Sequence, residues 1–243
     1  MNALAPFPHP PMAARAGITR LTALDPDFAR IEPAAGPLPW RTRAPGFPAF
    51  LSAIVGQQIS NQAAAAIWGR LSAIPGSTTP EGLLRLRDEE LRVAGLSRPK
   101  ITHVRAVAEA FVAGVLAEQS LAAMEDAAAI AAISGVRGLG PWSAEIYLLF
   151  ALQRPDVFPA GDLALQAAYA HLKNLPARPA AAALRLAAAP WAPHRALAAR
   201  LLWHWWRHVT GRPSLDDEKP TPLPSAAPPQ KARRKDASAS LQR

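Results

Sequence analysis

Two places in the second half of the chain carry residues whose types and spacing could do chemistry. The first is the run GVRGLG at residues 135–140, which stands between two apolar stretches with helical spacing and is followed by Pro141. Glycines at 138 and 140 let the backbone turn tightly and expose consecutive N–H groups at a helix N-terminus, which suits an anion such as a DNA phosphate. The same run also fits an ordinary corner between two core helices.

The second place is Asp162, which directly follows Gly161 and begins a predicted helix that runs to about residue 174. The helix dipole and the first N–H groups of such a helix favour the ionised carboxylate. An ionised carboxylate can stabilise positive charge that develops in a reaction, and it can equally serve as a plain helix N-cap. Its surroundings are basic, because residues 127–212 hold nine Lys or Arg and only three acids. We therefore expect the nucleic-acid face in this half of the chain.

The composition supports a folded, polyanion-binding protein. The chain has 243 residues, half of them apolar, and 27 Lys or Arg against 18 Asp or Glu, a formal net charge of +9. A field of that sign favours nucleic acid, and after it an anionic membrane surface. The absence of cysteine excludes disulfides, thiol nucleophiles and cysteine-ligated zinc or iron–sulfur centres. His204 and His208 have no matching acidic ligand, so no metal pair is expected there.

The sequence predicts a cytoplasmic protein without a membrane anchor. Residues 1–15 hold four prolines and no apolar run of the signal-peptide kind, and the longest charge-free stretch, 44–69, is too polar for a bilayer span.

Helical spacing runs through the middle of the chain, and no stretch alternates as a β-strand would, so the predicted fold class is all-α. One helix is expected from about residue 48 to 71. Proline density marks the borders and divides the chain into a proline-rich segment at 1–40, a core at 41–212 and a disordered basic tail at 213–243.

Several motifs resemble a known family. The runs GLGPWSA at 138–144 and DVFPAGD at 156–162 are similar to those of the helix-hairpin-helix (HhH-GPD) DNA glycosylases, and within them to the DNA-3-methyladenine glycosylase II (AlkA-like) branch. FLSAIVGQQIS at 50–60, GLSRPK at 95–100 and WAPHR at 191–195 carry the same resemblance, in the same order. It implies two helical lobes with the active site in the cleft between them. The short stretch before the core implies a version without the branch's N-terminal β-domain.

The resemblance implies a role for each matched residue. Asp162 falls on the catalytic aspartate, and Trp142 and Trp203 fall on aromatic positions of the base pocket. Members that also cleave the strand carry a lysine where this chain has Trp142, which implies a monofunctional hydrolase without abasic-site lyase activity. The implied reaction flips an alkylated purine of the 3-methyladenine and 7-methylguanine class out of double-stranded DNA and hydrolyses its N-glycosidic bond.

The remaining implied contacts concern the DNA backbone. Gln58 falls on the wedge that fills the gap left by the flipped base, with Ile59 as its neighbour. The implied phosphate contacts are Gly138, Leu139, Gly140 and Ser143. Family hairpins can hold a monovalent cation through backbone carbonyls, here those of Ser134, Val136 and Leu139. No other cofactor and no protein partner is implied, and a monomer is expected.

Two alternatives stay open. The enzyme could act on another lesion, such as ethenoadenine, 1-methyladenine, or a mispaired or oxidised base. The chain could also be a non-catalytic helix-hairpin-helix module that grips DNA. Asp162 argues against the second alternative, because a phosphate clamp gains nothing from a carboxylate aimed at DNA.

Overall fold

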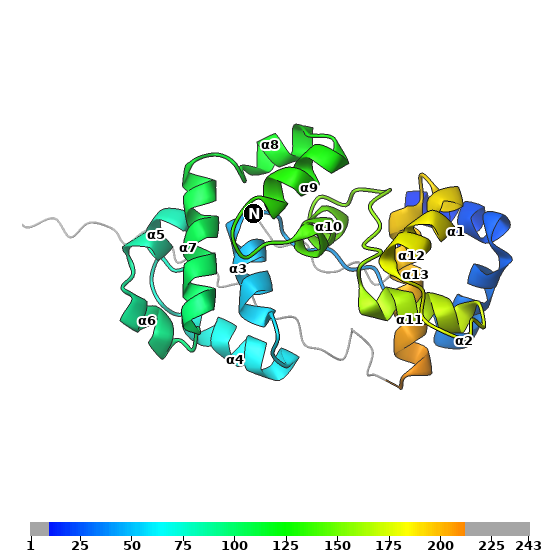
Figure 1. Ribbon diagram of the computed structural model, residues 1–243, viewed down its shortest axis with the longest axis horizontal. Helices are drawn as coiled ribbons and strands as arrows, with labels where there is room; N and C mark the ends of the chain where they lie inside the picture. Colours follow the sequence, from blue (N-terminus) through cyan, green and yellow to red (C-terminus); the bar gives the residue numbers. More distant parts are fainter. Residues whose placement is uncertain (1–9, 212–243) are drawn as a thin grey trace, which may run out of the picture.

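The computed structural model describes residues 10–211, which form helices and no strand (Figure 1). The predicted all-α class is thereby confirmed, and no helix in this part of the chain has the length and apolar character needed to cross a membrane. The elements in chain order are α1 (Met12–Leu24), η1 (Pro26–Arg30, a 3₁₀ helix), α2 (Ile31–Ala35), α3 (Phe47–Gly56), α4 (Asn61–Ser72), α5 (Pro80–Arg85), α6 (Asp88–Val93), α7 (Arg98–Val112), α8 (Glu118–Ala123), α9 (Asp126–Ser134), α10 (Pro141–Phe150), α11 (Leu163–Leu172), α12 (Ala181–Ala187), η2 (Ala189–Trp191, 3₁₀) and α13 (Arg195–Val209).

The helices form two lobes, each with its own apolar core (Figure 1). The first lobe holds α3 to α9, and the second holds α1, η1, α2, η2 and α11 to α13. Helix α10 lies between them. Its residues Ala144, Tyr147 and Leu148 belong to the first core, whereas Leu149 belongs to the second. The two-lobed arrangement expected from the sequence is therefore present, with α10 as the element that both lobes share.

The segment before residue 40 is part of the second lobe. Leu21, Phe28 and Ile31 are fully or almost fully buried in that lobe's core. The Phe28 ring meets the edge of Trp191 at 5.0 Å between centroids, and Arg30 donates to the carbonyl of Leu172. Residues on both sides of the expected boundary at residue 40 thus belong to one lobe, because apolar residues of α1 to α2 pack against α13. The expected tail at 213–243 lies outside the described residues.

The single helix expected over 48–71 is wrong. Helix α3 ends at Gly56 and α4 begins at Asn61, with a turn between them. Gln58 has a φ of 59°, which lies in the left-handed region, and the Ser60 hydroxyl accepts the N–H of Ala63 as the N-cap of α4. The apolar spacing continues across the turn and so suggested one helix, whereas capping and the left-handed residue end α3 and start α4.

Candidate active site

The glycine-rich hairpin joins α9 to α10 in the first lobe. Gly138 has a φ of 94°, and a Cβ there would lie 2.4 Å from Cγ of His103, so both backbone conformation and space require glycine. A Cβ on Gly140 would meet open space. Neither a positive φ nor crowding therefore requires glycine at position 140, where it serves as the N-cap of α10.

The hairpin can present backbone donors to an anion. Gly140 is the N-cap of α10, and Pro141 takes the first helical position, where its missing N–H costs nothing. The N–H groups of Trp142 and Ser143 come next, in the first turn, where a helix offers them no internal partner. The Leu139 side chain is 6% exposed and packs in the first core. The expected phosphate contact of Leu139 is therefore one of its backbone, and it stays a prediction.

Arg137 is a functional candidate that the sequence argument did not single out. It lies exposed in the hairpin, between Val136 and Gly138, and it makes no ion pair within residues 10–211. The position of Arg137 within the run GVRGLG could have indicated this, because a basic residue in such a turn adds positive charge where a phosphate would bind.

The turn between α3 and α4 lies next to the hairpin. Gln57 donates through Nε2 to the carbonyl of Gly138 at 3.0 Å, which fixes the turn against the hairpin. Gln58 and Ile59 are exposed at its tip. The expected wedge pair and the expected phosphate contacts therefore lie on neighbouring loops of one lobe, as a protein that grips a strand and fills its stack requires.

Asp162 is placed by α11, whose N-cap it forms. Its Oδ1 accepts the backbone N–H groups of Ala164 at 2.8 Å and Leu165 at 2.9 Å. The N-cap interpretation is thus confirmed, but it uses one oxygen only. Asp162 also lines an open depression of about 320 Å³, together with Trp142, Gly161, Leu163 and Ala164. The carboxylate therefore caps a helix and faces a space outside the core.

Two tryptophans from different helices converge on this carboxylate. Trp142, in the first turn of α10, donates its indole N–H to Oδ2 of Asp162 at 2.9 Å. Trp203, on α13, donates its indole N–H to Oδ1 at 3.2 Å. The resemblance implied that both residues are faces of a base pocket, and neither hydrogen bond was predicted from the sequence. No sequence signal could have shown them, because the direction of an indole N–H depends on how three helices pack.

The tryptophans differ in exposure and support. The Trp142 side chain is 47% exposed, so one of its surfaces is open to solvent. Trp203 is partly buried and stacks on Phe150 with ring centroids 5.7 Å apart and an interplanar angle of 28°. A ring with one face covered has its other face left for a partner. The site therefore combines one open indole with one backed indole.

Arg200 supports the wall behind Trp203. It lies one turn earlier on α13, almost fully buried, with its guanidinium carbon 4.3 Å from the Trp40 ring and 4.6 Å from the Phe150 ring. It donates to the carbonyls of Arg41 and Leu149. Burial lowers the pKa of Arg200 to about 10, so the group stays protonated at neutral pH. These contacts of Arg200 hold Phe150 in place, and Phe150 in turn supports the Trp203 ring.

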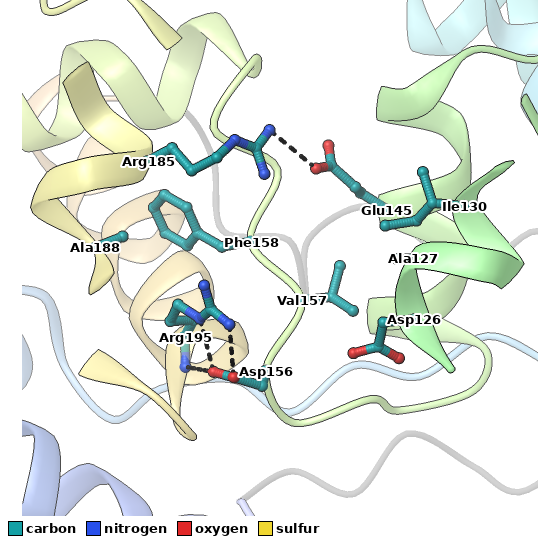
Figure 2. A pocket seen from close by; sticks show the side chains of 10 residues that line it. All are labelled: Asp126, Ala127, Ile130, Glu145, Asp156, Val157, Phe158, Arg185, Ala188 and Arg195. Atoms are coloured by element: carbon teal, nitrogen blue, oxygen red, sulfur yellow. Dashed lines mark hydrogen bonds and ion pairs between the residues drawn. The ribbon is translucent and has the colours of Figure 1, made fainter. Parts of the chain in front are cut away.

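A second pocket, of about 160 Å³, opens where the lobes meet (Figure 2). Figure 2 shows its two ion pairs, a bidentate one between Arg195 and Asp156 at 2.7–2.8 Å and a looser one between Arg185 and Glu145 at 3.4 Å. Burial raises the pKa of Glu145, whereas hydrogen bonds from Arg195 lower the pKa of Asp156. None of the expected site residues lines this pocket.

The sequence predicts no metal pair at His204 and His208, and it predicts a carbonyl cation site at the hairpin. Residues 10–211 hold no cluster of three His, Asp or Glu side chains suited to a metal ion, and His204 contacts the carbonyl of Gly36 instead. The carbonyl cation site at the hairpin depends on other atoms. There the Ser134 hydroxyl is buried without a partner, and the Val136 carbonyl accepts the N–H of Leu139. Neither observation tests the expected backbone carbonyls as cation ligands, so the site stays a prediction.

The chain is similar in sequence to known proteins. Residues 51–193 match the family described as HhH-GPD superfamily base excision DNA repair protein. A DNA-3-methyladenine glycosylase of Schizosaccharomyces pombe is 31% identical over 158 residues, which are 63% of this chain and 69% of the relative. A DNA-3-methyladenine glycosylase of Saccharomyces cerevisiae is 31% identical over 124 residues, but this match spans 47% of the chain and only 42% of the relative.

The structural comparison gives the same relationship. A solved structure of the S. pombe 3-methyladenine DNA glycosylase in complex with abasic DNA superimposes with a TM-score of 0.69 at 28% identity. The superposition covers 79% of this chain and 95% of that one. The likeness therefore extends over both lobes rather than over the hairpin alone.

Proposed function

The chain belongs to the HhH-GPD superfamily of base excision DNA repair proteins, and from that premise we propose that it is a DNA glycosylase for alkylated purines. Its substrates would be bases of the 3-methyladenine and 7-methylguanine class in double-stranded DNA. The observation that carries this proposal is the Asp162 carboxylate, which lines an open depression and is held there by two indole N–H groups.

The pocket suits a cationic base. Alkylation at a ring nitrogen gives 3-methyladenine and 7-methylguanine nucleotides a positive charge and weakens their N-glycosidic bond. The exposed Trp142 ring, and the Trp203 ring that stacks on Phe150, would offer π surfaces to such a base. A cation over a desolvated aromatic face gains roughly 1–2 kcal/mol that a neutral base does not. The site therefore selects by charge and by the weakness of the bond.

The reaction follows from the carboxylate. After the base is flipped out, the bond between C1′ and the base nitrogen breaks, and its electron pair leaves with the base. The sugar becomes an oxocarbenium-like cation, which the negative charge of Asp162 stabilises. A water molecule adds to C1′ and loses a proton, which yields an abasic site and the free base. The carboxylate supplies charge, orientation and a proton acceptor.

The lysines support a monofunctional enzyme. Strand cleavage through a Schiff base needs an uncharged lysine amine at the sugar, and the position twenty residues before Asp162 holds Trp142. Within residues 10–211 the chain has two lysines, and both are engaged elsewhere: Lys173 with Asp25 and Asp27, and Lys100 with the carbonyl of Val55. We therefore expect hydrolysis without abasic-site lyase activity.

The hairpin supplies the grip on DNA. The backbone N–H groups after Gly140 and the Arg137 side chain would contact phosphates, and Gln58 with Ile59 would fill the space of the flipped base. A monovalent cation on the carbonyls of Ser134, Val136 and Leu139 would hold the hairpin in shape. No other cofactor is needed for hydrolysis. A monomeric state and a cytoplasmic location stay predictions.

The test is release of free bases from methylated duplex DNA, resolved by chromatography, for the wild type and Asp162→Asn. Asparagine also caps helices well, so the variant removes charge with little change in fold. We expect 3-methyladenine or 7-methylguanine from the wild type only, with DNA binding equal in both. Binding without release by either protein would instead support the non-catalytic module, and release of a different lesion base would move the substrate class.

A further inference from the structure

The two oxygens of Asp162 are held differently. Oδ1 accepts three hydrogen bonds, from the N–H groups of Ala164 and Leu165 and from the Trp203 indole. Oδ2 accepts one from within residues 10–211, that of the Trp142 indole. A carboxylate oxygen offers about two lone-pair directions. Oδ1 is therefore fully occupied, and Oδ2 is the oxygen with capacity left.

We propose that Oδ2 is the oxygen that faces the sugar of the flipped nucleotide, and that the Trp142 indole N–H positions it. This inference rests on the proposed glycosylase activity. The Trp142 N–H acts through Asp162, which makes Trp142 a positioning residue in this respect, whereas its ring face is the part assigned to the base. Trp203 holds the oxygen that the backbone already holds.

The chemistry of the donor matters. The two backbone N–H groups of α11 fix Oδ1, and the Trp142 N–H at 2.9 Å then fixes the plane of the carboxylate. An indole N–H is uncharged, so it orients the oxygen without cancelling its charge. A lysine or arginine at position 142 would orient the same oxygen and also pair with it, which would weaken its attraction for a cationic sugar. Tryptophan thus supplies direction alone.

The experiment separates the N–H from the ring. Trp142→Phe keeps an aromatic surface and removes the donor. A second variant carries 3-benzothienylalanine at position 142, which keeps the full size of the bicyclic ring and replaces N–H by sulfur. We measure single-turnover release of 7-methylguanine from methylated duplex DNA, and separately the affinity for duplex DNA with an abasic-site analogue.

Both variants are expected to release the base roughly 10- to 100-fold more slowly, the usual effect of losing a hydrogen bond to a charged group. DNA affinity should change by less than about threefold, because the hairpin contacts are untouched. The matched comparison carries 3-benzothienylalanine at position 203, which keeps the ring face assigned to the base and removes only the indole N–H. Oδ1 then keeps its two backbone donors, so the positioning of Oδ2 should survive and the rate should fall much less than with 3-benzothienylalanine at position 142.

Three results would overturn the proposal. Wild-type rates with 3-benzothienylalanine at position 142 beside a slow Trp142→Phe would assign the effect to ring size. Equal losses with 3-benzothienylalanine at positions 142 and 203 would remove the distinction between the oxygens. Loss of DNA affinity in step with rate would give Trp142 a structural role. Absence of base release from the wild type is a separate outcome, since it would refute the proposed function itself.

Discussion

Carboxylates lie close to α10 at two places, the lobe junction and the depression, and their hydrogen-bond donors differ in charge. At the lobe junction, Asp156 and Glu145 pair with Arg195 and Arg185 (Figure 2). In the depression, Asp162 takes four hydrogen bonds, all from uncharged N–H groups, and none of the ion pairs within residues 10–211 includes it. An arginine cancels the charge that it orients, whereas an N–H does not. The junction therefore uses the Asp156 carboxylate for cohesion, and the depression keeps the Asp162 carboxylate available for a cation.

The same chemical change at both places should give opposite phenotypes, and this is the largest expected effect. Asp162→Asn should lower base release by about a thousandfold or more, since the charge that stabilises the sugar is lost, with a melting temperature close to that of the wild type. Asp156→Asn should leave the rate within a few fold. Single-turnover base release and thermal unfolding of both variants check the contrast. A large loss of rate in Asp156→Asn would remove it.

A cationic side chain placed beside Asp162 should pair with its carboxylate, as Arg195 pairs with Asp156 at the junction. Leu163 is 61% exposed and lines the depression, so Leu163→Lys can bring an ammonium near the carboxylate without disturbing the core. We expect base release to fall roughly 10- to 100-fold, which corresponds to about 1.4–2.8 kcal/mol. Leu163→Gln is the control of similar length without charge. Equal rates in the two variants would show that the charge of Asp162 is not what the reaction needs.

At the lobe junction, removing a carboxylate charge should lower the free energy of unfolding. Asp156→Asn removes a bidentate, partly buried ion pair with Arg195, whose side chains are 26% and 32% exposed. We expect a loss of about 1–3 kcal/mol in the free energy of unfolding at neutral pH. The pKa of Asp156 is lowered in the folded state, so its contribution is present above the ordinary pKa and lost as the pH falls through the folded value. The difference between wild type and variant in urea unfolding should therefore shrink on acidification. A stability difference that persists at low pH would show that it does not come from the ionised Asp156 carboxylate.

Glu145 gives the smallest effect, with the opposite sign. Burial raises the pKa of Glu145 above its ordinary value of 4.5, and its partner Arg185 is largely exposed. A raised pKa means that the favourable contribution is complete at low pH and is lost as the pH rises through the folded value. Glu145→Gln should therefore gain stability relative to the wild type as the pH rises from about 4 to 7. Unfolding curves across that range measure it, and a constant difference would contradict the cause.

Much of the local structure could be predicted. The glycines of the hairpin, Pro141 at the start of α10 and Asp162 at the start of α11 all act within a few residues of themselves, where backbone preferences and capping decide the outcome. The break at Gln58 could not be predicted from spacing. It depends on the left-handed conformation of Gln58. The neighbouring Gln57 donates a hydrogen bond to the carbonyl of Gly138, eighty-one residues further along the chain.

The sequence by itself determined the all-helical class, the hairpin and the position of the carboxylate along the chain, because short-range sterics and N-caps depend on neighbouring residues. Tertiary structure alone decided the rest. It brought Trp203 to an aspartate forty-one residues earlier, packed α1 to α2 against α13, and buried Arg200 between Trp40 and Phe150. Which side of a carboxylate an indole N–H reaches is settled by the angles at which helices pack, and those angles depend on the whole core.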